Sequence, residues 1–210
     1  MEWFQLPLGP MQTNAYIVYN DHQECLIIDP GEEAQKIKSF IKQKELNPLG
    51  ILLTHAHFDH IGALEEIRNE YHIEVYMHIQ EKSWLGKPEK NGSALFQGIK
   101  PIVASAAEQI WERESSVEIG HFSFELLHTP GHSPGSMSFY FKESSFVIAG
   151  DALFNGSIGR TDLPGGNMDE LIKSINTKLM TLDDQTYVLP GHGLTTTIGT
   201  ERLNNPFLQS

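Results

Sequence analysis

Residues 54–60 carry the side chains best suited to chemistry in this chain. They read Thr-His-Ala-His-Phe-Asp-His and follow the apolar run at 51–53. Imidazole nitrogens and carboxylate oxygens are the usual ligands of zinc, iron and manganese in proteins. Alternate residues of an extended segment share one face, so three donors should point the same way: His55, His57 and Asp59. The cluster favours a metal site over the simpler alternative, a polar histidine-rich loop.

His60 can join this cluster only if the chain turns there. The residues that follow, Ile61-Gly62 and then a helical pattern, predict such a turn. Four donors this close together can fill half of the ligand shell around each of two adjacent ions. The cluster therefore predicts part of a two-metal site, which the rest of the chain must complete.

Three later segments offer the missing donors. They read Thr-Pro-Gly-His-Ser at 129–133, Ala-Gly-Asp at 149–151 and Leu-Pro-Gly-His at 189–192. Each donor lies at a turn after an apolar strand pattern, where a rigid sheet can hold it at the rim of a cleft, and glycine before a histidine permits a close backbone approach. Together the four segments give seven candidate metal ligands: His55, His57, Asp59, His60, His132, Asp151 and His192.

The seven donors divide between two ions. One set is His55, His57 and His132, and the other is Asp59, His60 and His192. Asp151 has two oxygens and can bridge the ions, with a water or hydroxide as the second bridge. Such a site is open to substrate, as a catalytic centre must be. It also lowers the pKa of bound water from about 15.7 toward about 7.

The elements that must hold these donors alternate between strand and helix patterns. A helical pattern runs from 33 to 44, a second from 62 to 71, and a third begins after Asn167, with Glu170 placed as its capping partner. Strand patterns lie at 15–19, 24–29, 50–54, 74–77, 122–128, 136–141, 145–149 and 187–189. Residues 84–100 are irregular, and we interpret them as a cover over the site.

This order predicts an α/β (α+β) fold in which two sheets pack face to face between outer helices. The result is a four-layer αββα sandwich that forms one domain over residues 1–210. A doubly wound sheet is the alternative that the pattern leaves open.

Composition restricts the classes of partner. The chain has 210 residues, a net charge of −12 and no run long enough to span a bilayer, so we expect neither a nucleic-acid nor a membrane partner. The N-terminus has no secretory signal pattern. Cys25 is the only cysteine and lies in an apolar run, so we expect it to be buried in a cytoplasmic protein. A small molecule is the expected substrate, and the oligomeric state is left open.

The four donor segments, in this order, resemble the metallo-β-lactamase superfamily across residues 13–193. The resemblance implies the αββα fold and the ligand division given above. It also implies that Asp151 is the bridging aspartate, which the best-known zinc β-lactamases replace with a cysteine at a second-metal position. Cys25 lies in the wrong place to supply that ligand, so antibiotic hydrolysis is disfavoured.

Residues 150–154 and 159–162 are similar to the hydroxyacylglutathione hydrolase (glyoxalase II) branch, which cleaves thioesters. In that branch a basic residue nine positions after the bridging aspartate contacts the substrate, and Arg160 stands there; an ion pair with Asp162 is its structural alternative. The chain departs from the branch at Asp162 and Leu194, where tyrosines are usual, and it ends without the basic C-terminal helices. It therefore most resembles the short bacterial glyoxalase II-like hydrolases.

The expected activity is zinc-dependent hydrolysis of a small thioester or ester, with iron or manganese as alternative metals. The resemblance implies that a bridging hydroxide attacks the carbonyl carbon and that Asp59 orients it and accepts its proton. One alternative is a mononuclear iron persulfide (sulfur) dioxygenase that uses only His55, His132 and Asp151. A non-catalytic metal-binding module is another, and the acidic composition disfavours a nuclease.

Overall fold

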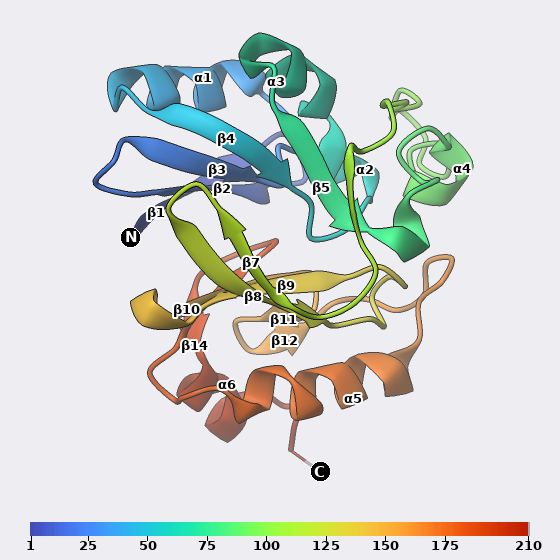
Figure 1. The fold of residues 1–210 in the computed structure, drawn as a ribbon. Helices are drawn as coiled ribbons and strands as arrows, with labels where there is room; N and C mark the ends of the chain where they lie inside the picture. Colours follow the sequence, from blue (N-terminus) through green and yellow to red (C-terminus); the bar gives the residue numbers. More distant parts are fainter. Residues whose placement is uncertain (210) are drawn as a thin grey trace. The chain divides into compact units, whose positions relative to one another are not determined.

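The computed structural model describes residues 1–209, which divide into two compact units (Figure 1). Unit 1 comprises Met1–Glu112 and Glu118–Phe122. Unit 2 comprises Arg113–Val117 and the described chain from Ser123 onward. Each unit is built on one large sheet. None of the helices in residues 1–209 has the length and apolar content that crossing a bilayer requires.

The sheet of unit 1 has the strand order β1-β2-β3-β4-β5-β6. The first three strands pair antiparallel, and β3 to β6 pair parallel. Parallel neighbours need crossover connections, so the helices of this unit lie in the connections between β3 and β6. The strand bounds are β1 (Glu2–Leu8), β2 (Thr13–Tyr19), β3 (Glu24–Ile28), β4 (Asn47–Leu52), β5 (Glu74–His78) and β6 (Gln109–Trp111).

Helices α1 and α3 of unit 1 bury one apolar stripe each against this sheet (Figure 1). Ile37 and Ile41 of α1 and Ile67 of α3 share a core cluster with the inward side chains of β2, β3 and β4. Their spacing of three or four residues puts these side chains on one helix face. The helix bounds are α1 (Ala34–Gln43), α2 (Phe58–Ile61), α3 (Leu64–Tyr71), η1 (Ile79–Glu81) and α4 (Pro88–Asn91).

The sheet of unit 2 has the strand order β14-β13-β10-β9-β8-β7. Strands β10 and β13 pair parallel, whereas β8–β9, β9–β10 and β13–β14 pair antiparallel. A separate two-stranded hairpin is formed by β11 and β12. The strand bounds are β7 (Ser116–Ile119), β8 (Phe122–His128), β9 (Met137–Phe141), β10 (Phe146–Gly150), β11 (Leu153–Phe154), β12 (Ser157–Ile158), β13 (Tyr187–Pro190) and β14 (Thr196–Thr197).

Helix α5 supplies the second layer of unit 2. Its residues Leu171 and Ile175 are fully buried with Val147 and Val188 of the sheet. The predicted cap is confirmed, because Asn167 Oδ1 accepts a hydrogen bond from the Glu170 amide at 3.0 Å. The helix bounds are η2 (Lys142–Ser144), α5 (Met168–Thr177), η3 (Leu179–Thr181) and α6 (Ile198–Asn204).

Most of the predicted elements are present, but the edges of the sheets were missed. Strands β1, β6, β7, β11, β12 and β14 and the short helices α2 and α6 have no counterpart in the predicted pattern. Helix α2 begins at Phe58, so the prediction that Asp59 lies in an extended segment with His55 and His57 was wrong. Residues 84–100 were expected to be the least regular part of the chain, and within them Pro88–Asn91 form the short helix α4. Proline at the first helical turn and Gly92 at a φ of 86° after the last one explain this helix.

Candidate metal centre

Two neighbouring parallel strands of unit 1 end at the same edge of the sheet. Ile28 of β3 is paired with Leu52 of β4, and the Asp29 amide donates to the Leu52 carbonyl at 3.2 Å. Asp29 therefore lies beside the start of the His-rich segment. Parallel strands place the residues after their carboxyl ends together, which is where open α/β sheets bind ligands.

Asp29 is the hydrogen-bonding centre of this edge. Its Oδ1 accepts from the Thr54 amide at 2.8 Å, and its Oδ2 accepts from Thr54 Oγ1 at 2.6 Å. The same Oδ2 lies 2.9 Å from His60 Nδ1. All three residues are buried. A carboxylate can only accept, so the proton lies on Nδ1 of His60 and leaves the Nε2 lone pair available to a metal.

The same argument fixes the tautomer of His55. Thr54 has one hydroxyl proton, which it donates to Asp29. The Oγ1 atom of Thr54 lies 3.0 Å from Nδ1 of His55, so this nitrogen must be the donor. Asp29, His55 and His60 form a buried group with N and O atoms within 4.8 Å of one another. Both Asp29 oxygens accept from these residues, so Asp29 holds the candidate ligands His55 and His60 in place.

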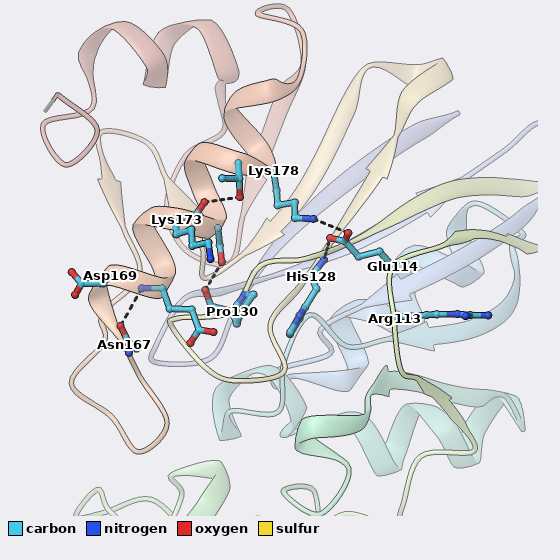
Figure 2. Close-up of a pocket in the computed structure, with 11 residues that line it drawn as sticks. Arg113, Glu114, His128, Pro130, Asn167, Asp169, Lys173 and Lys178 are labelled. Carbon is cyan, nitrogen blue, oxygen red and sulfur yellow. Dashed lines mark hydrogen bonds and ion pairs between the residues drawn. The ribbon is translucent and has the colours of Figure 1, made fainter.

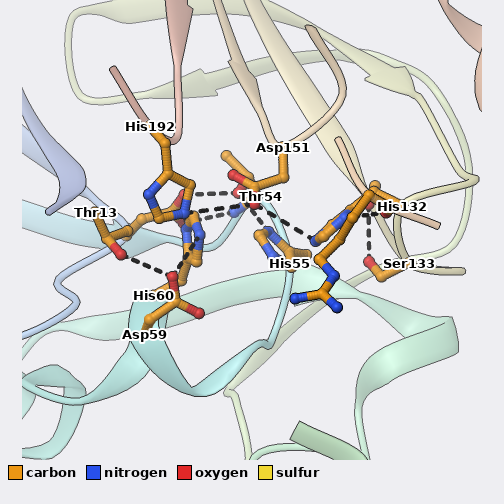
Figure 3. A network of polar contacts seen from close by, with 12 residues as sticks. Thr13, Thr54, His55, Asp59, His60, His132, Ser133, Asp151 and His192 are labelled. Atoms are coloured by element: carbon orange, nitrogen blue, oxygen red, sulfur yellow. Dashed lines mark hydrogen bonds and ion pairs between the residues drawn. The ribbon is translucent and has the colours of Figure 1, made fainter. Parts of the chain in front are cut away.

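The side chain of Asp59 is held in place by a threonine of β2. Thr13 Oγ1 in β2 donates to Asp59 Oδ2 at 2.7 Å, and the same oxygen lies 3.5 Å from His60 Nε2 (Figure 3). Two ligands bound to one ion at about 2.1 Å in tetrahedral geometry are about 3.4 Å apart. The Asp59–His60 separation therefore fits a shared ion.

His57 completes the donors of unit 1. Its ring meets that of His55 edge to face, with 4.8 Å between the ring centroids, and packs against Trp84 at 5.8 Å. The peptide between the two histidines is held in place because the Ala56 amide donates to Glu81 Oε2 at 2.6 Å. This buried hydrogen bond restrains both imidazoles.

In unit 2, one carboxylate oxygen lies between two histidines. Asp151 Oδ2, just after β10, is 3.5 Å from His132 Nε2 and 3.6 Å from His192 Nε2 (Figure 3). His132 donates from Nδ1 to the carbonyl of Arg160 at 2.8 Å, so its Nε2 lone pair points at the carboxylate. Two lone pairs facing each other at this distance are stabilised by a cation that both bind. In unit 2, a single carboxylate oxygen of Asp151 thus lies close to the imidazole nitrogens of two histidines.

The loop that carries His132 is braced by α5 (Figure 2). Ser174 Oγ donates to the Pro130 carbonyl at 2.7 Å, and the Asn167 amide donates to the Gly131 carbonyl at 2.7 Å. Gly131 has a φ of 128°, and a Cβ there would overlap the backbone of Leu171. Only glycine suits this position, because the backbone of α5 approaches it closely.

An open groove of about 900 Å³ lies on the outer side of this brace (Figure 2). Charged side chains of both signs line it, and none of the seven candidate ligands does. The groove is therefore lined in part by residues that support the His132 loop, and it is separate from the predicted donor set. Its lining residues are Arg113, Glu114, His128, Pro130, Asn167, Asp169, Glu170, Lys173, Ser174, Thr177 and Lys178.

Arg160 forms a two-pronged ion pair with Asp162. Both N···O distances are 2.7 Å, and the two side chains are 54% and 67% exposed. The guanidinium lowers the pKa of Asp162 to about 2. The ion pair that was the structural alternative for Arg160 is thus present, and its exposure still leaves the guanidinium within reach of a ligand.

Each unit therefore gathers its own predicted donors. Unit 1 brings together His55, His57, Asp59 and His60, and unit 2 brings together His132, Asp151 and His192. All of these donors are nitrogen or oxygen atoms, which suits zinc, iron or manganese. Cys25 is buried in β3 as predicted, and burial raises the pKa of its thiol to about 12.

The supporting residues Thr13, Asp29, Thr54 and Glu81 were not predicted. Asp29 could have been found, because it ends an apolar strand before Pro30-Gly31 and has the positive φ of 50° that Asp tolerates. Glu81 has no such signal, since only the tertiary structure brings it to the Ala56 amide.

Comparison with known proteins agrees with this geometry. Residues 8–192 match the family model described as metallo-beta-lactamase superfamily. The chain is 53% identical to a probable metallo-hydrolase, YqgX, of Bacillus subtilis over 99% of this chain and 98% of that one. It is 37% identical to hydroxyacylglutathione hydrolase GloC of Haemophilus influenzae, over 98% and 97%.

Solved structures give the same result. The crystal structure of BLEG-1 B3 metallo-beta-lactamase matches with a TM-score of 0.97 and 48% identity, over 100% of both chains. TTHA1623 in a di-iron-bound form matches with a TM-score of 0.85 and 39% identity, over 98% of this chain and 100% of that one. The predicted fold class, a mixed α and β fold of the metallo-β-lactamase type, is confirmed.

Proposed function

The chain belongs to the metallo-beta-lactamase superfamily, and we propose that, as a metal-dependent hydrolase, it cleaves a small thioester or ester. The observation that carries this proposal is the position of Asp151. Its Oδ2 atom lies at a ligand-to-ligand separation from two different imidazoles. A single oxygen placed in this way suits a carboxylate shared by two ions.

Two ions are proposed to bind to the seven predicted donors. His55, His57 and His132 hold one ion, and Asp59, His60 and His192 hold the other. Asp151 is shared between them. The fixed tautomers of His55, His60 and His132 support this division, because each presents Nε2 to the site.

When bound, two divalent ions make water a nucleophile near neutral pH and polarise the substrate carbonyl. The side chains supply the remaining requirements. Asp59, held by Thr13, would accept the proton of the attacking water and could then pass it to the departing thiolate or alkoxide. Arg160 offers a guanidinium to an anionic part of the substrate. Its carbonyl meanwhile holds His132 in the productive tautomer.

A thioester is favoured by the relative described as a hydroxyacylglutathione hydrolase, which matches over nearly its whole length. Hydrolysis of β-lactams is a second candidate, because a structure described as a B3 metallo-beta-lactamase is 48% identical. Persulfide oxidation by a single iron and a non-catalytic metal-binding role are the remaining alternatives. All four differ in metal content, oxygen use or reaction product.

Zinc is the proposed metal, with iron as its main competitor, since a similar structure is di-iron-bound. The donor set does not discriminate between them, because imidazole and carboxylate suit both. We propose a cytoplasmic location on the basis of the single buried cysteine, which needs no oxidising compartment.

The test is to purify the full chain, measure zinc, iron and manganese per chain, and assay the same preparation. Substrates are acyl thioesters of small thiols, lactones, a β-lactam, a phosphodiester and a persulfide with an oxygen electrode. The proposal predicts two metal ions per chain and fastest turnover of a thioester or ester without oxygen uptake. One iron per chain with oxygen consumption would instead assign persulfide oxidation.

A variant of a proposed ligand and a matched control variant are assayed beside the wild type. His55→Ala removes a proposed ligand, whereas His22→Ala removes a histidine on an exposed turn far along the sequence from any donor. The proposal predicts that His55→Ala loses metal and at least about 100-fold of kcat/KM, while His22→Ala keeps both. Full metal-dependent activity in His55→Ala would rule the proposal out.

A further inference from the structure

The segment 92–101 of unit 1 forms a loop with a rigid base. The side chain of Asn91 donates to the carbonyls of Trp84 and Ile102 at 3.2 and 2.9 Å. Its Oδ1 accepts from the amide and hydroxyl of Ser93 at 3.0 and 2.7 Å, and Ser93 Oγ accepts from the Ile102 amide at 2.9 Å. Asn91 and Ser93 are both fully buried. These bonds close the loop and fix its start and end.

This base is attached to the segment of the candidate ligands. Trp84, which accepts from Asn91, packs on the ring of His57 at 5.8 Å. Within the loop, Phe96 packs on Phe58 with 5.4 Å between ring centroids. Phe58 lies between the donors His57 and Asp59. The loop is thus held directly beside the proposed metal site.

The tip of the loop carries no charged side chain and includes an exposed apolar one. Residues 94–99 read Ala-Leu-Phe-Gln-Gly-Ile, and the nearest charged residue in sequence is Lys100. Leu95 is 52% exposed although Phe96 beside it is half-buried. An exposed leucine alone needs no explanation, but here a fixed apolar tip borders a site that binds a small molecule.

We propose that Leu95 and Phe96 bind the acyl group of the substrate and select for an aliphatic chain longer than acetyl. The inference rests on the proposed function and names its substrate class. The acyl group is chosen over the thiol carrier because biological carrier thiols are polar or charged, and the loop tip offers them no ionic partner. An aliphatic acyl group gains free energy by removing this apolar surface from water.

The test uses the metal-loaded full chain and a series of thioesters of one small uncharged thiol, N-acetylcysteamine. The acyl groups are acetyl, butyryl, hexanoyl and octanoyl. A methylene that is half-buried on an open wall contributes about twofold, so kcat/KM should rise about tenfold from acetyl to hexanoyl. In Leu95→Ser and Phe96→Ala this ratio should fall below about threefold. Metal content per chain is measured alongside.

Val103→Ser is the matched control. Val103 is 64% exposed in the same irregular region but lies after the Ile102 end of the base, outside the loop. This variant should keep the wild-type ratio of hexanoyl to acetyl turnover. A fall as large as that of Leu95→Ser would show that loss of any apolar surface has the effect, and would overturn the assignment.

A binding measurement separates this inference from the proposed function. The S-octyl thioether of N-acetylcysteamine cannot be hydrolysed, and its affinity is measured by calorimetry. If no thioester is cleaved but Leu95→Ser weakens this binding about tenfold, the proposed function fails and the apolar contact stands. If thioesters are cleaved without chain-length preference, or the variants bind the thioether as wild type does, the inference is overturned.

Discussion

Oδ2 of Asp29 accepts a hydrogen bond from Nδ1 of His60 across 2.9 Å, although the two residues are 31 positions apart. The bond joins the end of β3 to α2 and leaves His60 Nε2 to face Asp59. Asp29 also accepts two bonds from Thr54, so one carboxylate sets the tautomers of two proposed ligands. The candidate site of unit 1 therefore depends on a residue outside the predicted donor set.

Replacing Asp29 with asparagine should weaken metal binding. An amide has one acceptor oxygen for three donors, so at least one donor would face the amide NH₂ group. We expect metal affinity to fall about 10- to 100-fold and the free energy of unfolding to fall by about 1–3 kcal/mol. A chelator competition titration measures the first effect. Asp21→Asn, on an exposed turn, is the control, and equal affinity in both variants would contradict the role of Asp29.

Gly131→Ala should destabilise the chain more than Gly156→Ala. Its Cβ would overlap the backbone of Leu171, and its φ of 128° is unfavourable for alanine. Gly156→Ala is a matched control, since Gly156 also has a positive φ of 68° but has open space around it. Chemical denaturation should show losses of about 3 kcal/mol and about 1 kcal/mol respectively. Equal losses of unfolding free energy in the two variants would mean that α5 does not pack tightly against Gly131.

Glu24 should make the free energy of unfolding depend on pH in the acid range. Hydrogen bonds from Asn20 and His121 lower the pKa of this carboxyl from 4.5 to about 2. A lowered pKa means that the stabilisation is fully present above pH 4.5 and is lost as the pH falls toward 2. Glu24→Gln should therefore show a smaller loss of unfolding free energy between pH 5 and pH 3 than wild type. The exposed Glu143→Gln should behave as wild type; an unchanged slope in Glu24→Gln would refute the assignment.

Variants of Arg160 and Asp162 test whether their exposed ion pair contributes to substrate binding. Solvent screens an exposed ion pair, so Arg160→Ala should leave the melting temperature nearly unchanged. If the guanidinium contacts an anionic substrate, Arg160→Ala should raise KM several-fold more than it lowers kcat. Asp162→Asn should lower KM by releasing the guanidinium. A KM that neither variant alters would leave Arg160 with only its backbone role toward His132.

Sequence patterns pointed to the candidate metal donors more readily than to the residues that hold those donors in place. His55, His132 and Asp151 could be found because turns after apolar strands are recognisable locally. Asp29 and Glu81 act through hydrogen bonds to residues 25 and more positions away, and no local pattern encodes such partners. Strands β1 and β6 were missed because they lie at sheet edges, where a half-exposed strand loses its apolar periodicity.

The helices were predicted where their own residues define them. Asn167 and Glu170 fixed the start of α5, and Ile37 with Ile41 marked the buried face of α1. The loop at 92–101 could not be predicted, since its shape depends on the buried side chains of Asn91 and Ser93, which resemble ordinary loop residues in the sequence. Polar residues whose partners are tertiary are the part that sequence patterns do not reveal.

The central claim is that Asp151 is shared by two ions. The most direct measurement is the number of metal ions per chain in wild type and in Asp151→Ala, determined by elemental analysis after equilibration with excess zinc and removal of unbound metal. We predict two ions in wild type and at most one in Asp151→Ala, with thioester hydrolysis lost in parallel. Two tightly bound ions and unchanged hydrolysis in Asp151→Ala would contradict the claim.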